Sequence, residues 1–318
     1  MGFTPHLFGQ TIEIISVEKV NDYIQTDTGT TSPRPLVPSN QSYPFTFRID
    51  VEGTGLGSLD APTFTTPAAG SYDDTTDPNL GVLIYDAGDG EWGRTFTFGA
   101  KYTATGGAPG GSGIWGAGPG GTGTGGMDGW FNNGAYTVTV NGETVNLQLG
   151  GDGNVDVYPN TPIATLSAGT WAGGGLNRLY LNPNEALTIN TGTFTNFGTA
   201  GYVSGINLFI GQNGTDVVDM LSLSSNLLND AGWINTDSLE HTFGAGSLVA
   251  GTEYYVEIEF FNLTTVQNIS ELDGALALAI FSSRTQFSIS VVPEPSTYAV
   301  ICGALALAGV VVVRRRKV

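Results

Sequence analysis

The stretch YTVTVNGETVNLQL, residues 136–149, decides the fold class. On both sides of Asn141-Gly142, β-branched and apolar residues alternate with polar ones, which predicts two strands that each bury one face. Asn-Gly suits the two-residue type I′ turn that joins antiparallel strands. The stretch therefore predicts a β-hairpin.

The same alternation recurs along the chain, at residues 11–17, 45–51 and 94–98 and in shorter runs from 163 to 291. No segment before residue 293 has a convincing helical period over the length of a helix. The nearest is Val217 to Leu228, which suits either one short helix or a strand and a turn. The sequence therefore predicts an all-β fold.

The turn-rich segment GGDGNVDVYPNTP, residues 150–162, divides the strands into two sets of similar size. We predict two antiparallel β-sandwich domains, immunoglobulin-like or jelly-roll-like, at residues 11–150 and 151–292. The similar segments 134–140 and 251–258 agree with a duplication, while one larger sandwich with long insertions is the alternative. Within the first domain, the glycine-rich residues 106–129 predict a surface loop.

The body of the protein, residues 1–292, is strongly acidic. Seven basic residues oppose 28 acidic ones there, giving a formal charge of −21, and only 13% of the whole chain is charged. The electrostatic field of this negative charge repels phosphate backbones and anionic lipid. It therefore argues against nucleic-acid binding and favours cations and neutral or cationic glycans as ligands. The single cysteine, Cys302, lies beyond the body, which therefore has no disulfide and no thiolate site.

Residues suited to catalysis are sparse. The two histidines, His6 and His241, lie far apart and outside any known catalytic motif, so we expect no enzymatic activity. A glycosidase needs only two carboxylates and stays possible on this ground. Tryptophans in or beside glycine-rich turns suit either sugar-binding platforms or plugs at the ends of a sandwich. They are Trp92, Trp115, Trp130, Trp171 and Trp233.

Asp152, Asn154 and Asp156 form the candidate metal site. Their D-x-N-x-D spacing can direct three oxygen ligands at one Ca²⁺. The pattern is incomplete, because Val157 and Ile163 stand where an EF-hand loop has Gly and Glu. A plain turn rich in Asp and Asn is the alternative, and the sequence predicts no other cofactor.

The C-terminus carries a candidate membrane segment. The 18 residues from Ser296 to Val313 have no charge and would span about 27 Å as a helix, close to the thickness of a bilayer core. The basic tail that follows stays on the cytoplasmic side by the positive-inside rule, which places the body outside the cytoplasm. The tail consists of Arg314, Arg315, Arg316 and Lys317.

Pro293-Glu294-Pro295 precedes this segment and forces an extended backbone of the kind that proteases bind. The order of Pro-Glu-Pro, apolar helix and arginine-rich end, over about residues 291–318, resembles the PEP-CTERM sorting signal of Gram-negative bacteria. The resemblance implies that exosortase, a membrane-embedded cysteine peptidase, recognises Pro293, Glu294 and Pro295 and releases the body outward. A plain C-terminal anchor is the alternative.

The N-terminal residues 1–10 have no Lys or Arg and no apolar run of signal-peptide length. We expect them to be a leader, or the end of a longer signal peptide. Proteins of the resembled family are often associated with exopolysaccharide and biofilm. We therefore expect an exported structural or adhesive protein of the cell surface or extracellular matrix, with a secreted lectin or polysaccharide-active enzyme as the alternative.

Overall fold

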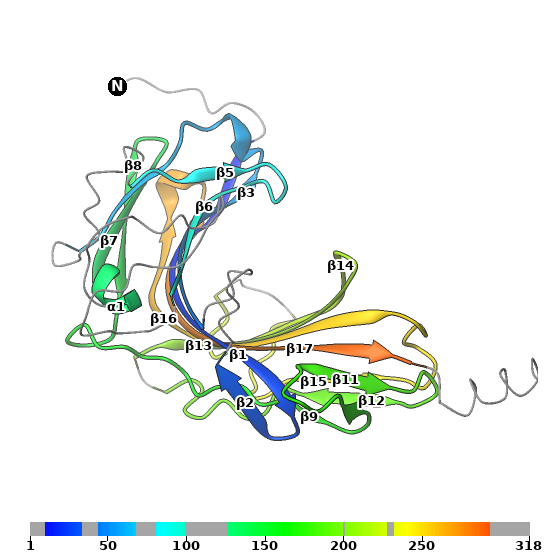
Figure 1. Cartoon of the computed structure of the whole chain (residues 1–318). Helices are drawn as coiled ribbons and strands as arrows, with labels where there is room; N and C mark the ends of the chain where they lie inside the picture. The colour runs from blue at the N-terminus through cyan, green and yellow to red at the C-terminus, as the bar shows by residue number, and fades with distance from the viewer. Residues whose placement is uncertain are drawn as a thin grey trace, which may run out of the picture.

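The computed structural model describes residues 10–33, 44–67, 81–98, 126–199, 201–227 and 232–292. Strands make up nearly all of the regular structure in these ranges, which confirms the all-β class (Figure 1). The helical elements described are the short helix α1 (Gly126–Trp130) and the 3-10 turns η1 (Leu56–Ser58) and η2 (Ser270–Leu272). None of them has the length or the apolar character to cross a membrane. The expected membrane segment, the sorting motif, the basic tail and residues 1–9 lie outside the described residues.

In the described parts of the chain, one large sheet of 11 strands forms the frame. Its strands are β1 (Thr11–Asp27), β2 (Thr30–Pro33), β3 (Phe45–Thr54), β5 (Ile84–Asp86), β6 (Glu91–Phe98), β10 (Thr170–Trp171), β11 (Arg178–Leu181), β13 (Val203–Gln212), β14 (Thr215–Leu223), β16 (Glu253–Ile269) and β17 (Ala275–Val291). The main order is β14-β13-β16-β17-β1-β3-β6-β5, with β2 paired to β1, β11 to β17 and β10 to β11. Most neighbours are antiparallel, but β17 runs parallel to both β1 and β11.

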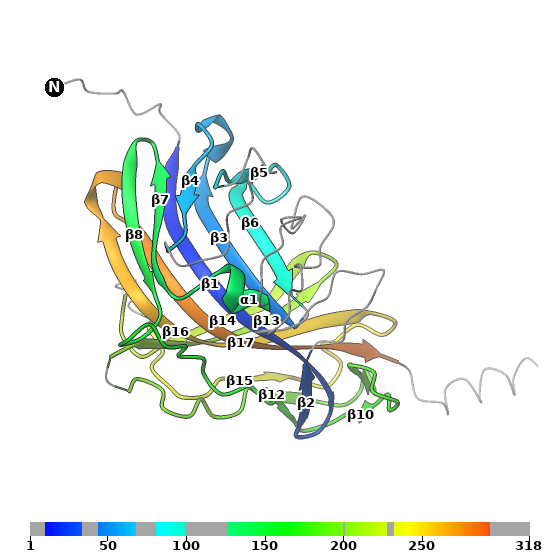
Figure 2. The same ribbon diagram turned by 60° about the vertical axis from the view of Figure 1, so that its left-hand side comes forward.

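Two small sheets cover the large one. The first has the order β4-β7-β8, and the second has the order β15-β12-β9. Their strands are β4 (Thr63–Thr65), β7 (Gly134–Val140), β8 (Glu143–Leu149), β9 (Thr165–Leu166), β12 (Leu187–Asn190) and β15 (Glu240–Phe243). The large sheet is sharply bent, and both small sheets lie on its convex face (Figures 1 and 2).

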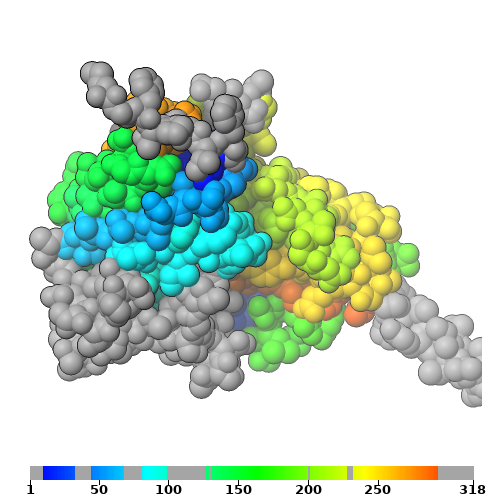
Figure 3. All heavy atoms as spheres, turned by 90° about the horizontal axis from the view of Figure 1, so that it is seen from above, coloured from blue at the N-terminus to red at the C-terminus, as the bar shows by residue number. Residues whose placement is uncertain are grey.

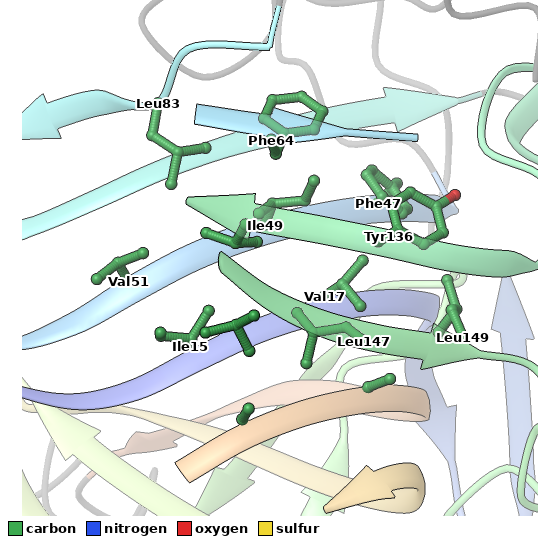
Figure 4. Close-up of a cluster of buried hydrophobic side chains, with 14 of the residues drawn as sticks. Ile15, Val17, Phe47, Ile49, Val51, Phe64, Leu83, Tyr136, Leu147 and Leu149 are labelled. Atoms are coloured by element: carbon green, nitrogen blue, oxygen red, sulfur yellow. The ribbon is translucent and has the colours of Figure 1, made fainter. Parts of the chain in front are cut away.

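Each small sheet encloses a separate hydrophobic core against the convex face. In the first core, Ile15 and Val17 of β1 meet Phe47 and Ile49 of β3 and Leu147 of β8 (Figure 4). The alternation of β17 shows how one strand serves both cores. Its odd-numbered residues up to Phe281 belong to the first core, and those from Phe287 onward belong to the second.

Independent sandwich domains are not confirmed, because β16 and β17 run through both cores. Each has 17 residues, beyond the usual 3 to ~10 residues of a strand. The sequence predicted only shorter runs up to residue 291, whereas β17 is continuous from Ala275 to Val291. Four residues of β17 complete the first core, so residues 11–150 do not close it alone. A domain boundary at residue 150 stays a prediction.

The expected linker crosses the bend and is held there by side chains of the large sheet. The Ser283 hydroxyl donates to the carbonyl of Pro159 at 3.0 Å, and the Thr285 hydroxyl donates to that of Pro162 at 2.7 Å. The side-chain amide of Gln25 exchanges two hydrogen bonds of 2.8 Å with the backbone of Ala164. Since these groups are buried, each would be costly to leave unpaired, so together they hold the linker against the large sheet.

Two local expectations are resolved by the structure. The segment Val217–Leu228 begins as strand β14 and not as a helix. Residues 126–129, expected at the end of the glycine-rich loop, belong to α1, where Met127 and the following Trp130 are fully buried. Large apolar side chains anchor this end of the segment to the first core, while residues 106–125 lie outside the described ranges.

Candidate functional site

The concave face of the large sheet carries the best-formed site. Both small sheets lie on the opposite face, and a hollow of about 240 Å³ opens on the concave side. Seen from above, it lies between the blue and cyan strands and the lime-green β14 (Figure 3). We call it the concave groove. It is lined by Ile14, Ser16, Glu18, Arg48, Glu52, Leu221, Leu223, Leu227, Glu259, Phe261, Leu263, Leu276, Leu278 and Ile280.

One part of the concave groove is apolar. It exists because the even-numbered residues of β17 and those of β1 from Ile14 onward point away from the cores, so that Ile14 lies beside Leu276 in the parallel register. On the other side, Leu223 of β14 pairs with Gly205 of β13, which in turn pairs with Phe261. A Cβ atom at position 205 would overlap the Phe261 ring, so Gly205 provides the space in which this ring lies.

The other part is charged. We define the charged cluster as Glu18, Asp22, Arg48, Asp50, Glu52, Glu257, Glu259 and Arg284. Its six carboxyl groups exceed its two arginines, so full ionisation would leave an excess of negative charge in a partly desolvated site. Such an excess favours retained protons or bound cations.

Arg48 organises one half of the cluster. Its Nε donates to Asp50 at 3.0 Å, and its Nη1 lies 3.8 Å from Glu18, its cross-strand neighbour on β1. The Asp50 carboxylate raises the pKa of Arg48. The carboxylate lies over Gly93 of β6, where a Cβ atom would overlap it. The buried Ser282 hydroxyl donates to Glu18 at 2.7 Å.

Arg284 organises the other half. Its Nε donates to Asp22 at 2.7 Å, and its Nη1 lies 3.6 Å from Glu257. Asp22 also accepts the Thr46 hydroxyl at 2.9 Å, and Glu257 accepts the amide of Gln286 at 2.7 Å. Since both arginines already bind carboxylates of the protein, neither is a free receptor for an anionic ligand.

Burial raises the pKa of three carboxyl groups of the cluster into the range from about 6 to about 8. Burial raises the pKa of Asp50 from 3.8 to about 6, although Arg48 opposes the shift. Burial and then the charge of Glu91 raise the pKa of Glu52 to about 7. Burial and then the charge of Glu18 raise the pKa of Glu259 to about 8, while Arg284 opposes it. The concave groove therefore exchanges protons in the physiological range.

Asn207 lies next to Glu259, one of the carboxyl groups with a raised pKa. It pairs in register with Glu259, and its side-chain oxygen is buried with no hydrogen-bond partner among the described residues. A carboxyl group that keeps its proton is a donor of the kind this oxygen lacks. Where Glu52 and Glu259 line the groove beside its apolar residues, protonated carboxyl groups suit a ligand that offers apolar surface and hydrogen-bond acceptors.

A second polar site lies on the convex side of β1. Lys19 is fully buried there, and its Nζ donates to Asp128 and to Asn133, each at 2.8 Å. The side-chain amide of Asn133 donates to Asp156 at 2.8 Å and to the carbonyl of Asn154 at 2.9 Å. These residues line a hollow of about 470 Å³.

The structure brings two of the three predicted calcium ligands to this second site. Asn154 and Asp156 line the hollow, whereas Asp152 is exposed outside its lining. The side-chain oxygen of Asn154 already accepts the amide of Gln148 at 2.7 Å. Among the described residues no three Asp, Glu, His or Cys side chains gather as a metal site. Calcium binding stays a prediction, which a rise in the unfolding temperature with millimolar Ca²⁺ would support.

Sequence reasoning missed Lys19 as a site residue, although a signal was present. Lys19 continues the inward positions Ile15 and Val17 of β1, so the alternation alone places a lysine at a core position. A buried lysine needs a partner, which predicts a carboxylate or amide nearby. Sequence spacing could not identify Asp128 and Asn133 as those partners.

The described tryptophans are placed mainly in the cores. Trp130 is fully buried, and Trp92 and Trp171 pack against the two cores as plugs. Trp233 is 38% exposed and donates its indole N–H to the Leu223 carbonyl. Trp115 lies outside the described residues. The four described tryptophans therefore form no shared platform in the concave groove, whose lining contains none of them.

Comparison with known families identifies the end of the chain. Residues 291–317 match the PEP-CTERM protein-sorting motif. The match confirms the resemblance seen in the sequence and contains Pro293, Glu294 and Pro295 as well as the basic tail. None of the curated proteins compared with the chain matches it. The chain thus carries a PEP-CTERM sorting signal, which implies export and processing by an exosortase.

Proposed function

We propose that this protein is an exported, non-enzymatic component of the cell surface or extracellular matrix, structural or adhesive in role. The observation that carries the proposal is the PEP-CTERM motif at residues 291–317. The strongly acidic body agrees with it, because such a surface stays dispersed and avoids anionic lipid and nucleic acid.

The junction between body and motif supports processing. Val291 is the last residue of β17 and the first residue of the matched motif. It is fixed by backbone hydrogen bonds with Gly251 and Thr252, while the Val292 N–H donates to Leu181. Neither described core uses a residue beyond Val291. Cleavage within residues 293–295 would therefore remove the tail without removing any residue of these cores.

Mass spectrometry of the mature C-terminus in the native host tests the proposal. We expect the body recovered from the cell surface or medium to end near Pro293-Glu294-Pro295. A host without its exosortase should retain the full chain in the inner membrane. Surface-located protein that still ends at Val318 would reject processing, and a body found in the cytoplasm would reject the function itself.

The concave groove favours a second candidate function, a glycan-binding lectin or a polysaccharide-active enzyme. This candidate function is supported by the apolar part of the concave groove, which lies beside carboxyl groups with raised pKa values, Glu259 above all. Incubation of the protein with exopolysaccharide from the host separates the candidates. Binding alone indicates a lectin, binding with release of shorter chains indicates an enzyme, and neither result leaves the structural role.

A further inference from the structure

Lys19, Asp128 and Asn133 have the geometry of a reactive group and not only of an ion pair. The ammonium nitrogen of Lys19 lies 2.8 Å from both the Asp128 carboxylate and the side-chain oxygen of Asn133. Because a carbonyl bond is ~1.2 Å long, the amide carbon of Asn133 is at most about 4 Å from this nitrogen. That separation is close to the ~3 to 3.5 Å at which bound groups react.

The surrounding residues hold Asn133 in the reactive orientation. Its amide nitrogen donates to Asp156 and to the carbonyl of Asn154, and its oxygen accepts from Lys19. The Tyr136 hydroxyl donates to the carbonyl of Asn132 at 2.7 Å and fixes the preceding residue. Hydrogen bonds at both ends of the carboxamide therefore limit its rotation.

The site is also shielded from bulk water on the lysine side. Lys19 has no exposed surface, and the same face of β1 meets the first core, with Val17 two residues away. Phe131 and Tyr136, on either side of Asn133 in the sequence, pack on Phe47. In such an environment a charged ammonium is costly, so transfer of its proton to a neighbouring carboxylate is favoured compared with water.

We propose that Lys19 and Asn133 form an intramolecular isopeptide bond after folding. Asp128 takes one proton from the Lys19 ammonium, and the free amine attacks the amide carbon of Asn133. The carbon–nitrogen bond to the original amide breaks, and a second lysine proton passes to the departing nitrogen. One ammonia molecule leaves, the new amide keeps one hydrogen on the lysine nitrogen, and Asp128 returns its proton to the medium. No atom changes its oxidation state overall.

Two groups have defined roles in this step. Asp128 contacts the reacting nitrogen and is the catalytic base. Asp156 accepts a hydrogen bond from the nitrogen that leaves, so it positions that group. The hollow of about 470 Å³ beside these residues offers ammonia a path out, since its lining includes Lys19, Asp128 and Asn133.

The bond would join distant parts of the first core. Its two ends are 114 positions apart, on β1 of the large sheet and immediately before β7 of the small sheet. The body has no cysteine and therefore no disulfide, so this amide would be its covalent cross-link. The inference goes beyond the proposed function, because it depends on the folded site and not on sorting.

Intact mass spectrometry of the folded full chain tests the proposal directly. We expect a mass about 17 Da below the value calculated from the sequence, and a cross-linked peptide pair that contains Lys19 and Asn133 after proteolysis. The full calculated mass for the wild-type chain would overturn the proposal, whether or not any variant folds. A deficit of about 18 Da with a link to Asp128 would overturn it as well, since water and not ammonia would have left.

Substitutions test which side chains form the bond and which one acts as the base. Lys19→Arg and Asn133→Ala should show the full calculated mass. In Asp128→Asn, whose new side chain has a similar volume, most of the mass deficit should be absent. The control Asn146→Ala, at an exposed position of β8, should keep the deficit. Because the cross-link restricts the unfolded chain, Asn133→Ala should also melt about 10 °C lower than the wild type. An unchanged deficit in Asn133→Ala would refute the assignment of Asn133.

Discussion

Glu259→Gln should make the stability of the protein less sensitive to pH. Glu259 lies on the concave face of β16, in register with Arg284 on one side and Asn207 on the other. Burial and the charge of Glu18 raise its pKa from 4.5 to about 8. Glutamine has nearly the same shape and is neutral at every pH, so it reproduces the protonated side chain.

The sign and the size of the effect follow from this shift. Between the unfolded pKa of 4.5 and the folded pKa of about 8, the folded chain holds a proton that the unfolded chain releases. The protonated carboxyl therefore contributes its full stability below pH 4.5, and this contribution is lost as the pH rises through 8. The loss between pH 5 and pH 8 corresponds to about 2.6 pKa units, because the folded group is only half titrated at pH 8, and at ~1.4 kcal/mol per unit it amounts to about 3.5 kcal/mol. For a chain of this size that corresponds to ~8 °C in unfolding temperature.

Thermal unfolding of the wild type and of Glu259→Gln at pH 5, 6.5 and 8 measures this difference. We expect the two proteins to be most similar at pH 5, and the variant to be more stable at pH 8. Glu143→Gln, at an exposed position beside the β7–β8 turn, is the matched control and should follow the wild type. Parallel pH profiles for the wild type and Glu259→Gln would refute the reasoning.

Two further substitutions test the concave groove and the bend. Gly205→Ala places a Cβ atom into the Phe261 ring and should cost about 1 to 3 kcal/mol in urea unfolding, whereas Gly244→Ala, with no atom within 4 Å, should be neutral. Equal costs for the two would contradict the contact. Thr285→Val removes the hydroxyl that donates to Pro162 and should lower the urea stability by about 1 to 2 kcal/mol, so an unchanged midpoint would show that this bond does not hold the linker.

Local features of the fold could be predicted from the sequence. The hairpin at residues 136–149 is present as β7 and β8, and its turn residues Asn141 and Gly142 have φ of 54° and 82°. These positive values are those of a type I′ turn, which explains why Asn-Gly was a reliable signal. Alternation likewise identified β1, β3 and β6, since each buries one face on a core.

The long-range features could not be predicted, because they depend on which strands pair. The parallel pairing of β1 with β17 joins residues near the two ends of the body, such as Ile14 and Leu276. The concave groove is built from β1, β3, β14, β16 and β17, which no local pattern brings together. The polar residues of β17 from Ser282 to Gln286 indicate a strand end in the sequence, whereas the strand continues through them and all but the half-buried Arg284 are buried.

The predicted and the observed acidic sites show the same dependence on strand pairing. Asp and Asn in turns drew attention to Asp152, Asn154 and Asp156, because their spacing is visible in the sequence. Carboxyl groups with raised pKa values, such as Asp50 and Glu259, lie within strands and become a cluster only when the sheet forms. In the sequence, these carboxyl groups are visible only as acidic residues at the outward positions of strands that otherwise alternate regularly.

The charge imbalance of the concave groove connects its stability with its binding. Six carboxyl groups share two arginines, and the structure relieves the imbalance by raising carboxyl pKa values, so that Glu259 keeps its proton up to about pH 8, Glu52 up to about pH 7 and Asp50 up to about pH 6. A cationic group bound beside them would relieve the same imbalance, so protons and such a ligand compete for the charged cluster. A cationic ligand should therefore stabilise the protein most above pH 8, where these protons are lost. A neutral ligand that needs the protonated carboxyl groups should bind best below pH 6, so the pH dependence of binding distinguishes the two kinds of partner.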